Sequence, residues 1–122
     1  NEYVGTEGNL APEVLLAAEN EKYFYGKEID IWSLGILFHE LLYGKRPFDG
    51  LRPSEAREAI VNKDFKAEEV DYISEETRKL LNRMLTRDPV KRITTKEMKE
   101  LNIIKKWSQE EEGNFFIEIL NE

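Results

Sequence analysis

The most apolar stretch of the chain runs from Ile29 to Gly44 and predicts a helix that other segments surround. Its hydrophobic side chains leave almost no polar face, which is typical of a helix buried on all sides. Asp30 can cap its amino end, and Gly44 can end it in a left-handed conformation, so we expect a central helix over residues 30–43. Such a helix spans about 20 Å, too short for a bilayer, and we expect no membrane partner.

Shorter apolar periodicities predict further helices over residues 12–18, 53–62, 75–86 and 95–101. Prolines fit the first turns of two of them, and serine or threonine caps fit the other two. No strand is predicted, so the chain as given is expected to be all-α. Residues 102–122 are expected to hold a loosely docked terminal helix. The prolines are Pro12 and Pro53, the caps are Ser74 and Thr94, and Glu97 completes a capping box with Thr94. The expected buried positions are Ala56, Ala59, Ile60, Leu80, Leu81, Met84, Leu85, Met98 and Leu101.

Composition narrows the possible partners and sites. The 122 residues, 40% of them hydrophobic, suffice for one compact domain at most. A net charge of -7 argues against a nucleic-acid partner, because such proteins usually present a basic surface. The absence of cysteine and the single histidine, His39, exclude disulfides and thiolate or multi-histidine metal sites. We expect an intracellular, cytoplasmic protein, and the start at Asn1 within a loop-like stretch suggests a piece of a longer chain.

Three separated motifs carry a resemblance to a known family. Residues 5–13 read Gly-Thr-Glu-Gly-Asn-Leu-Ala-Pro-Glu, residues 30–35 read Asp-Ile-Trp-Ser-Leu-Gly, and residues 88–92 read Asp-Pro-Val-Lys-Arg. In this order they resemble the activation-segment end, the central helix and the late Asp-Pro-x-x-Arg segment of a eukaryotic-type protein kinase of the Ser/Thr type. The resemblance extends through Gly44–Phe48 and thins after Trp107.

This resemblance implies a fold and a division of the chain. The chain would form the later part of the helical C-terminal lobe of a protein-kinase-like α+β fold, packed around one central buried helix. Its expected parts are the activation-segment end over 1–13, the central helix over 30–43, outer helices over 53–107 and a tail over 108–122.

Four residues are expected to hold this scaffold together. The resemblance implies that Glu13 pairs with Arg92, and a planar guanidinium can hold a carboxylate through two parallel hydrogen bonds. The alternative is that both are separate surface charges. The resemblance also implies that Asp30, besides capping its helix, accepts backbone N–H groups of the catalytic loop. Trp32 is expected to serve only packing.

The loop before the first helix is expected to face the substrate. By resemblance, Thr6 would support the catalytic loop and help place the acceptor hydroxyl, which favours a Ser/Thr kinase. Its alternative is a local turn cap. Glu7, Gly8, Asn9 and Leu10 would line the same loop. The family usually has tyrosine where this chain has Asn9, which puts the shape of that pocket in question.

Three further residues carry open alternatives. Glu40 would face a substrate arginine by resemblance, or merely reach the rim of its helix. Glu2 and Tyr3 lie where the family often carries activating phosphorylation, or they are simply solvated.

The chain lacks the motifs that hold ATP, magnesium and the attacking oxygen. No glycine-rich loop, Val-Ala-Ile-Lys lysine, His-Arg-Asp or Asp-Phe-Gly occurs in it. We therefore expect no catalytic, cofactor-binding or metal residue here, and no activity of this part alone. ATP and Mg²⁺ are implied for the parent kinase only. The expected partners are the remainder of the same kinase domain and a protein substrate, for which a basic sequence is one option. A pseudokinase scaffold and a free-standing helical interaction module are the alternatives.

Overall fold

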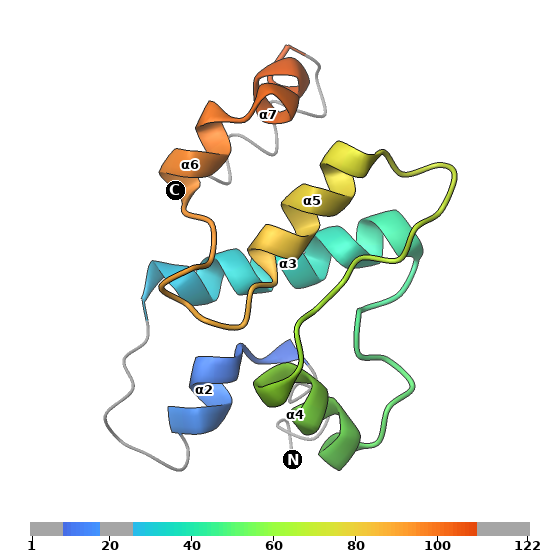
Figure 1. The fold of residues 1–122 in the computed structure, drawn as a ribbon, viewed down its shortest axis with the longest axis vertical. Coiled ribbons are helices and arrows are strands. Elements are labelled where there is room, and N and C mark those ends of the chain that lie inside the picture. Colours follow the sequence, from blue (N-terminus) through green and yellow to red (C-terminus); the bar gives the residue numbers. More distant parts are fainter. Residues whose placement is uncertain (1–8, 18–25, 110–122) are drawn as a thin grey trace. The chain divides into compact units, whose positions relative to one another are not determined.

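A computed structural model describes residues 9–17 and 26–109. These residues form two compact units, which divide between Arg92 and Ile93. The first unit contains α2 (Pro12–Ala17), α3 (Lys27–Tyr43), α4 (Pro53–Asn62) and α5 (Glu75–Met84), and the second contains α6 (Thr95–Glu100) and α7 (Asn102–Trp107) (Figure 1). Across the described ranges the regular structure is helical and no strand occurs, as predicted.

The central helix α3 begins at Lys27, earlier than predicted. Gly26, in an extended conformation, precedes it, so Asp30 is not its N-cap and that prediction is wrong. Asp30 instead lies exposed in the first turn, where a carboxylate still complements the positive end of the helix dipole. The other end is as predicted: Gly44 has φ 77° and donates its N–H to the carbonyl oxygen of Glu40.

The prediction that α3 is buried on all sides is also wrong for the described structure. Trp32 and Ile36 lie in the core, but Leu37 is 46% exposed and Leu41 is 74% exposed. These two leucines are four residues apart and so share one face of the helix. The apolar pattern therefore contains two faces, a buried one and an open one, which sequence composition cannot distinguish.

Helix α5 packs on α3 (Figure 1), and the side of α5 that is buried carries an apolar stripe. Gly35 allows this approach, because a β-carbon there would lie 2.9 Å from Leu85 Cδ2 and 3.1 Å from Met84 Cβ. Ser74 caps α5 as predicted, its hydroxyl accepting the N–H of Thr77. The helix ends at Met84 rather than residue 86. The predicted stripe is almost completely buried and consists of Leu80, Leu81, Met84 and Leu85.

Helix α4 has the predicted bounds, with Pro53 in its first turn and Ala56 and Ile60 buried. Its main helix contact is α2. The loop that follows is tied to α3 and α5 by two hydrogen bonds. Asn82 Oδ1 accepts the N–H of Ala67 at 2.6 Å, and the Tyr43 hydroxyl donates to the carbonyl oxygen of Glu68 at 2.6 Å.

The second unit contains two short helices in contact with each other. Thr94 and Glu97 form the predicted capping box of α6. A further helix, α7, follows directly after Leu101 and ends at Trp107, inside the segment 102–122 in which a terminal helix was expected. Residues 110–122 lie outside the described ranges. The buried apolar side chains of this unit are Ile93, Met98 and Ile104.

Candidate functional site

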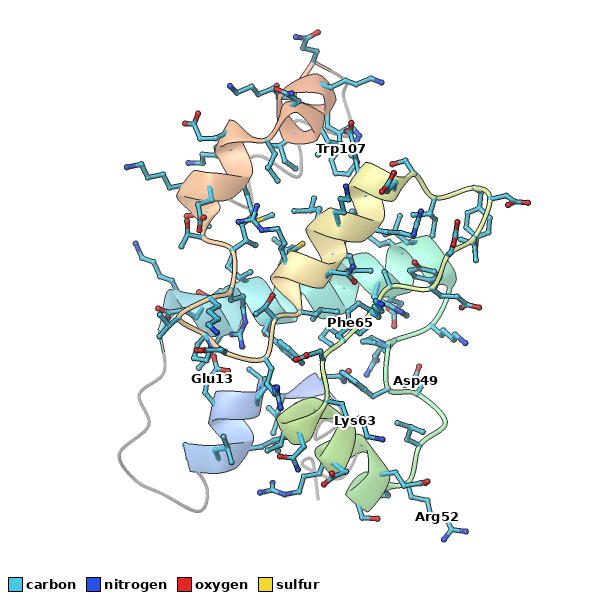
Figure 2. All side chains as sticks on the ribbon, viewed as in Figure 1. Glu13, Asp49, Arg52, Lys63, Phe65 and Trp107 are labelled. Atoms are coloured by element: carbon cyan, nitrogen blue, oxygen red, sulfur yellow. The ribbon has the colours of Figure 1, made fainter. Side chains whose placement is uncertain are left out.

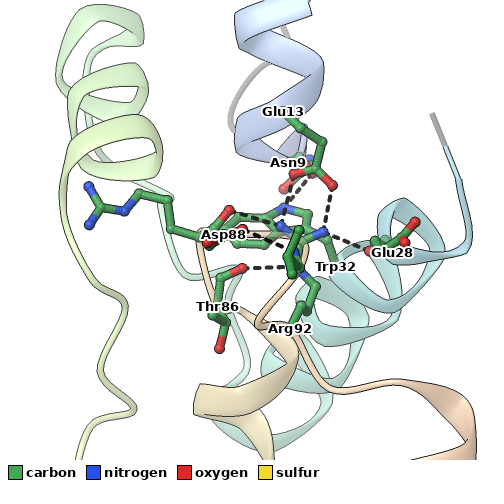
Figure 3. A network of polar contacts seen from close by, with 9 residues as sticks. Asn9, Glu13, Glu28, Trp32, Thr86, Asp88 and Arg92 are labelled. Atoms are coloured by element: carbon green, nitrogen blue, oxygen red, sulfur yellow. Dashed lines mark hydrogen bonds and ion pairs between the residues drawn. The ribbon is translucent and has the colours of Figure 1, made fainter. Parts of the chain in front are cut away.

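A buried ion pair joins two residues 79 positions apart in the sequence (Figure 3). Glu13 lies in the first turn of α2, and Arg92 follows the Asp88-Pro89 turn after α5. Nη1 of Arg92 lies 2.7 Å from Glu13 Oε2, and Nη2 lies 2.8 Å from Glu13 Oε1. The pair is therefore bidentate, and it ties the start of α2 to the segment that follows α5.

Arg92 is satisfied completely although its side chain is fully buried. Nε donates to the carbonyl oxygen of Thr86 at 2.8 Å, Nη1 also donates to that of Glu28 at 2.7 Å, and Nη2 also donates to that of Arg87 at 3.2 Å. With the two bonds to Glu13, these occupy all five N–H groups of a guanidinium. Such complete pairing is what makes a buried charge tolerable.

Trp32 links the same network to the loop before α2. Its indole Nε1–H donates to the carbonyl oxygen of Asn9 at 3.2 Å (Figure 3). Its ring lies 5.1 Å from the Arg92 guanidinium carbon and stacks on Phe48 with centroids 6.3 Å apart. Trp32 thus does more than the packing predicted for it. It fixes the backbone of Asn9 and covers the buried guanidinium with a cation-π contact.

A pocket of about 250 Å³ opens beside this loop. Asn9 and residues of α3 line it. The loop after α3 completes the lining, which comprises Asn9, Ser33, Ile36, Leu37, Glu40 and Arg46. Two of the expected substrate-side residues, Asn9 and Glu40, are therefore brought to one cavity. Leu10 is half-buried next to Asn9 but is not part of that lining.

Glu40 already has a cation beside it. Nε of Arg46 lies 3.0 Å from Glu40 Oε2, and both side chains are partly exposed. Asp49, in the loop after α3 (Figure 2), accepts the backbone N–H of Arg46 through Oδ2 at 3.1 Å. The turn that holds Arg46 is thus itself hydrogen-bonded, and it aims the guanidinium back toward α3.

His39, next to Glu40, is a packed side chain as expected. Nδ1 lies 2.6 Å from the carbonyl oxygen of Lys45, and because a carbonyl can only accept, Nδ1 carries the proton. The ring stacks on Tyr43 and meets Phe65 edge-on. Burial lowers the pKa of His39, an effect that the hydrogen bond to Lys45 and the charges of Asp49 and Glu68 oppose.

The structure leaves several sequence predictions without an observation. Thr6, Glu7 and Gly8 lie outside the described residues, as do Glu2 and Tyr3. Among the residues that the structure describes, no group of three or more histidine, cysteine or acidic side chains could hold a metal ion. In the same residues, no helix is long and apolar enough to cross a membrane.

Sequence reasoning missed two features of this site. Arg46 lies six residues after Glu40, beyond helical spacing, so only the turn after Gly44 reveals the pair. The hydrogen bond of Trp32 joins residues 23 apart and has no local signal. The close contact at Gly35, by contrast, has a local signal in the sequence, because a glycine inside an apolar helix commonly marks close packing.

Comparison with known proteins agrees with the motifs. The family model of the protein kinase domain matches residues 1–104. Calcium-dependent protein kinase 3 of Oryza sativa is 41% identical over 102 residues, which cover 82% of this chain and 17% of that protein. Serine/threonine-protein kinase KIPK2 of Arabidopsis thaliana is 34% identical over 93 residues, covering 76% of this chain and 9% of that protein.

A third relative extends the same pattern to animals. Serine/threonine-protein kinase mrck-1 of Caenorhabditis elegans is 38% identical over 96 residues, covering 75% of this chain and 6% of that protein. The chain thus spans less than a fifth of the length of these relatives. Because the family model matches most of the chain, from the Ala-Pro-Glu segment past Arg92, this chain belongs to the protein kinase domain family.

Proposed function

We propose that this chain is the substrate-side part of the helical lobe of a Ser/Thr protein kinase, which transfers the ATP γ-phosphate to a protein hydroxyl. The observation that carries the proposal is the buried Glu13–Arg92 pair, together with the Trp32 bond to Asn9. Both ties hold the segment around Asn9 to Glu13 against α3, next to the pocket that contains Glu40. Relatives that are named serine/threonine-protein kinases support serine and threonine as the acceptor residues.

The chain's own contribution would be positioning. Preorganised geometry is a large part of phosphoryl-transfer catalysis, because little covalent chemistry falls to the protein. A loop whose backbone is fixed at Asn9 and whose helix is fixed at Glu13 can present the preceding residues, including Thr6, in one arrangement. Within this proposal Thr6, Glu7, Gly8, Asn9, Leu10 and Glu40 contact the substrate, while Asp30 positions the catalytic loop.

ATP with Mg²⁺, when bound to the parent protein, supplies the phosphoryl group and neutralises its charge. The motifs that would hold them are absent from these 122 residues, so no residue of this chain is assigned to either. In the same proposal the parent protein works inside the cell, and a chain without cysteine is compatible with a reducing compartment.

The open face of α3 supports the proposal that the remainder of the kinase domain is a partner. Leu37 and Leu41 form an exposed apolar stripe, and large exposed apolar side chains in line commonly mark contact surfaces. The stripe borders the pocket that Leu37 lines with Glu40. A covering segment of the same domain would therefore complete the burial of α3 and close one side of that pocket.

The test uses the parent protein that contains this chain. Purified protein is incubated with ATP, Mg²⁺ and a degenerate peptide library in which the acceptor is serine, threonine or tyrosine. We expect transfer to serine and threonine peptides and none to tyrosine peptides. Transfer to tyrosine alone would overturn the Ser/Thr assignment. Peptide binding without any transfer would overturn the enzyme proposal in favour of a pseudokinase scaffold.

A further inference from the structure

We infer that Arg46 is a specificity-determining residue that competes with a basic substrate residue for the carboxylate of Glu40. The inference deepens the proposed function and rests on it, because it concerns the same substrate pocket. It assigns a role to a residue that no motif identified. Its consequence is that this kinase selects basic substrates less strongly than an unpaired Glu40 would.

The first support is geometric. The Arg46 guanidinium and the Glu40 carboxylate both line the pocket next to Asn9, and they are hydrogen-bonded at 3.0 Å. A basic substrate residue that reached Glu40 would enter the same cavity and meet the same oxygen atoms. Arg46 thus stands where such a residue would bind.

The second support is that the backbone fixes the position of Arg46. Gly44 ends α3 in a left-handed conformation, and the chain then turns back at Arg46. Asp49 Oδ2 accepts the N–H of Arg46, and the Asp49 N–H donates in return to the Arg46 carbonyl oxygen at 3.3 Å. The backbone of Arg46 is therefore held in one position, from which its side chain reaches the Glu40 carboxylate.

The third support is the exposure of the pair. The Arg46 side chain is 43% exposed and the Glu40 side chain is 44% exposed. Exposed ion pairs are weak, because water screens them and two long side chains lose rotamer freedom. A substrate cation can displace Arg46, but it must then approach a site that already holds one positive charge. Competition, rather than a permanent block, is the expected result.

The experiment measures substrate preference in the parent protein. Two serine peptides are compared that differ at one position only, which carries arginine in one peptide and norleucine in the other. This position is the one N-terminal to the acceptor serine at which the library shows the strongest preference for a basic residue. The measured quantity is the ratio of kcat/KM for the arginine peptide to that for the norleucine peptide. Arg46→Ala and Arg46→Gln are expected to raise this ratio by roughly two- to fivefold, the range to which exposed ion-pair energies correspond.

Matched controls separate the pocket from general charge. Lys45→Ala removes the neighbouring positive charge, and we expect the ratio to stay unchanged. Glu40→Gln in the Arg46→Ala background should return the ratio to about that of the original protein or below it. An unchanged ratio in both Arg46 variants, or an equal rise with Lys45→Ala, would overturn the inference.

A second readout separates this inference from the proposed function. Equilibrium binding of the same two peptides, labelled with a fluorophore, requires no phosphoryl transfer. If the parent protein transfers no phosphate, the enzyme proposal fails, whereas the binding ratio still tests Arg46. A higher arginine-to-norleucine affinity ratio in both Arg46 variants supports the competition, and an unchanged ratio overturns it.

Discussion

At the scale of single residues, Arg92 holds the start of α2 in place through Glu13. Its guanidinium has no access to solvent, so each of its N–H groups needs a protein acceptor. Two nearby carbonyl groups, of Thr86 and Arg87, and two distant groups, the Glu28 carbonyl and the Glu13 carboxylate, supply them, and only Glu13 supplies a compensating charge. Removing that carboxylate would leave a buried and uncompensated cation.

Glu13→Ala should therefore lower the free energy of unfolding by about 3 to 5 kcal/mol, as for other broken buried ion pairs. Urea denaturation of the purified protein measures the change. Lys79→Ala, which removes an exposed i,i+4 pair with Glu75, is the control and should cost less than about 0.5 kcal/mol. Equal effects of the two substitutions would contradict a special role for the Glu13–Arg92 pair.

At the scale of helices, the contact between α3 and α5 depends on a missing side chain. Gly35 leaves room for Leu85 and for the Met84 β-carbon, which cannot move without moving α5. Glycine loses more conformational entropy than other residues when a helix forms, which lowers stability. The packing of Leu85 and Met84 against Gly35 must offset this loss. The short helix α6 depends instead on its first turn, where a capping box satisfies backbone N–H groups, and in α4 the Glu55 carboxylate accepts the N–H of Arg52.

Gly35→Ala should destabilise the protein by about 1 to 2 kcal/mol, because overpacking outweighs the gain in helix propensity. Ser33→Ala, on an exposed position of the same helix, should change stability by less than about 0.5 kcal/mol. Both are measured by thermal unfolding. A Gly35→Ala protein as stable as the original would show that α3 and α5 are not held at this distance.

Thr94→Ala should cost about 1 kcal/mol by removing the cap of α6. The hydroxyl accepts the N–H of Glu97 at 3.1 Å, and this bond has no replacement in alanine. Amide hydrogen exchange in residues 95–100 is the measurement, with Thr95→Ala as the control one position later. Similar exchange in both variants would argue against the cap.

At the scale of the whole molecule, the only histidine of the chain makes stability depend on pH. His39 is buried, and its folded-state pKa is lowered below the ordinary value of 6.5. The unfolded chain therefore binds more protons just below pH 6.5, so its population is favoured there. The contribution of neutral His39 to stability is complete above about pH 6.5 and is lost as the pH falls through the lowered pKa.

Stability should accordingly fall between pH 7 and pH 5.5, by at most about 1.4 kcal/mol per pH unit from this group. Urea denaturation at each pH measures the slope. His39→Gln removes the titration and should flatten the curve, whereas Lys79→Ala, at an exposed position whose charge does not contribute to the His39 pKa shift, should leave the slope in place. Identical slopes for the original protein and His39→Gln would contradict the assignment.

The sequence predicted much of this protein because its signals are local. Helix caps at Ser74 and Thr94, the left-handed Gly44 and the bounds of α4 depend on residues within one turn of each other. The prediction failed at Asp30, where a good capping residue lies inside a helix that had already begun at Lys27. A capping preference is only a weak local signal, and the backbone is already helical from Lys27, where the Glu28 carbonyl oxygen accepts a hydrogen bond from the buried Arg92.

The motifs in the sequence by themselves determined the family, the order of the helices and the apolar positions that had to be buried somewhere. Only the tertiary structure decided which face of α3 is covered, that Trp32 fixes the backbone of Asn9, and that Arg46 rather than solvent lies beside Glu40. The physical reason is range. Helix propensity and capping act over a few residues, whereas burial and ion pairing depend on groups that only the folded chain brings together.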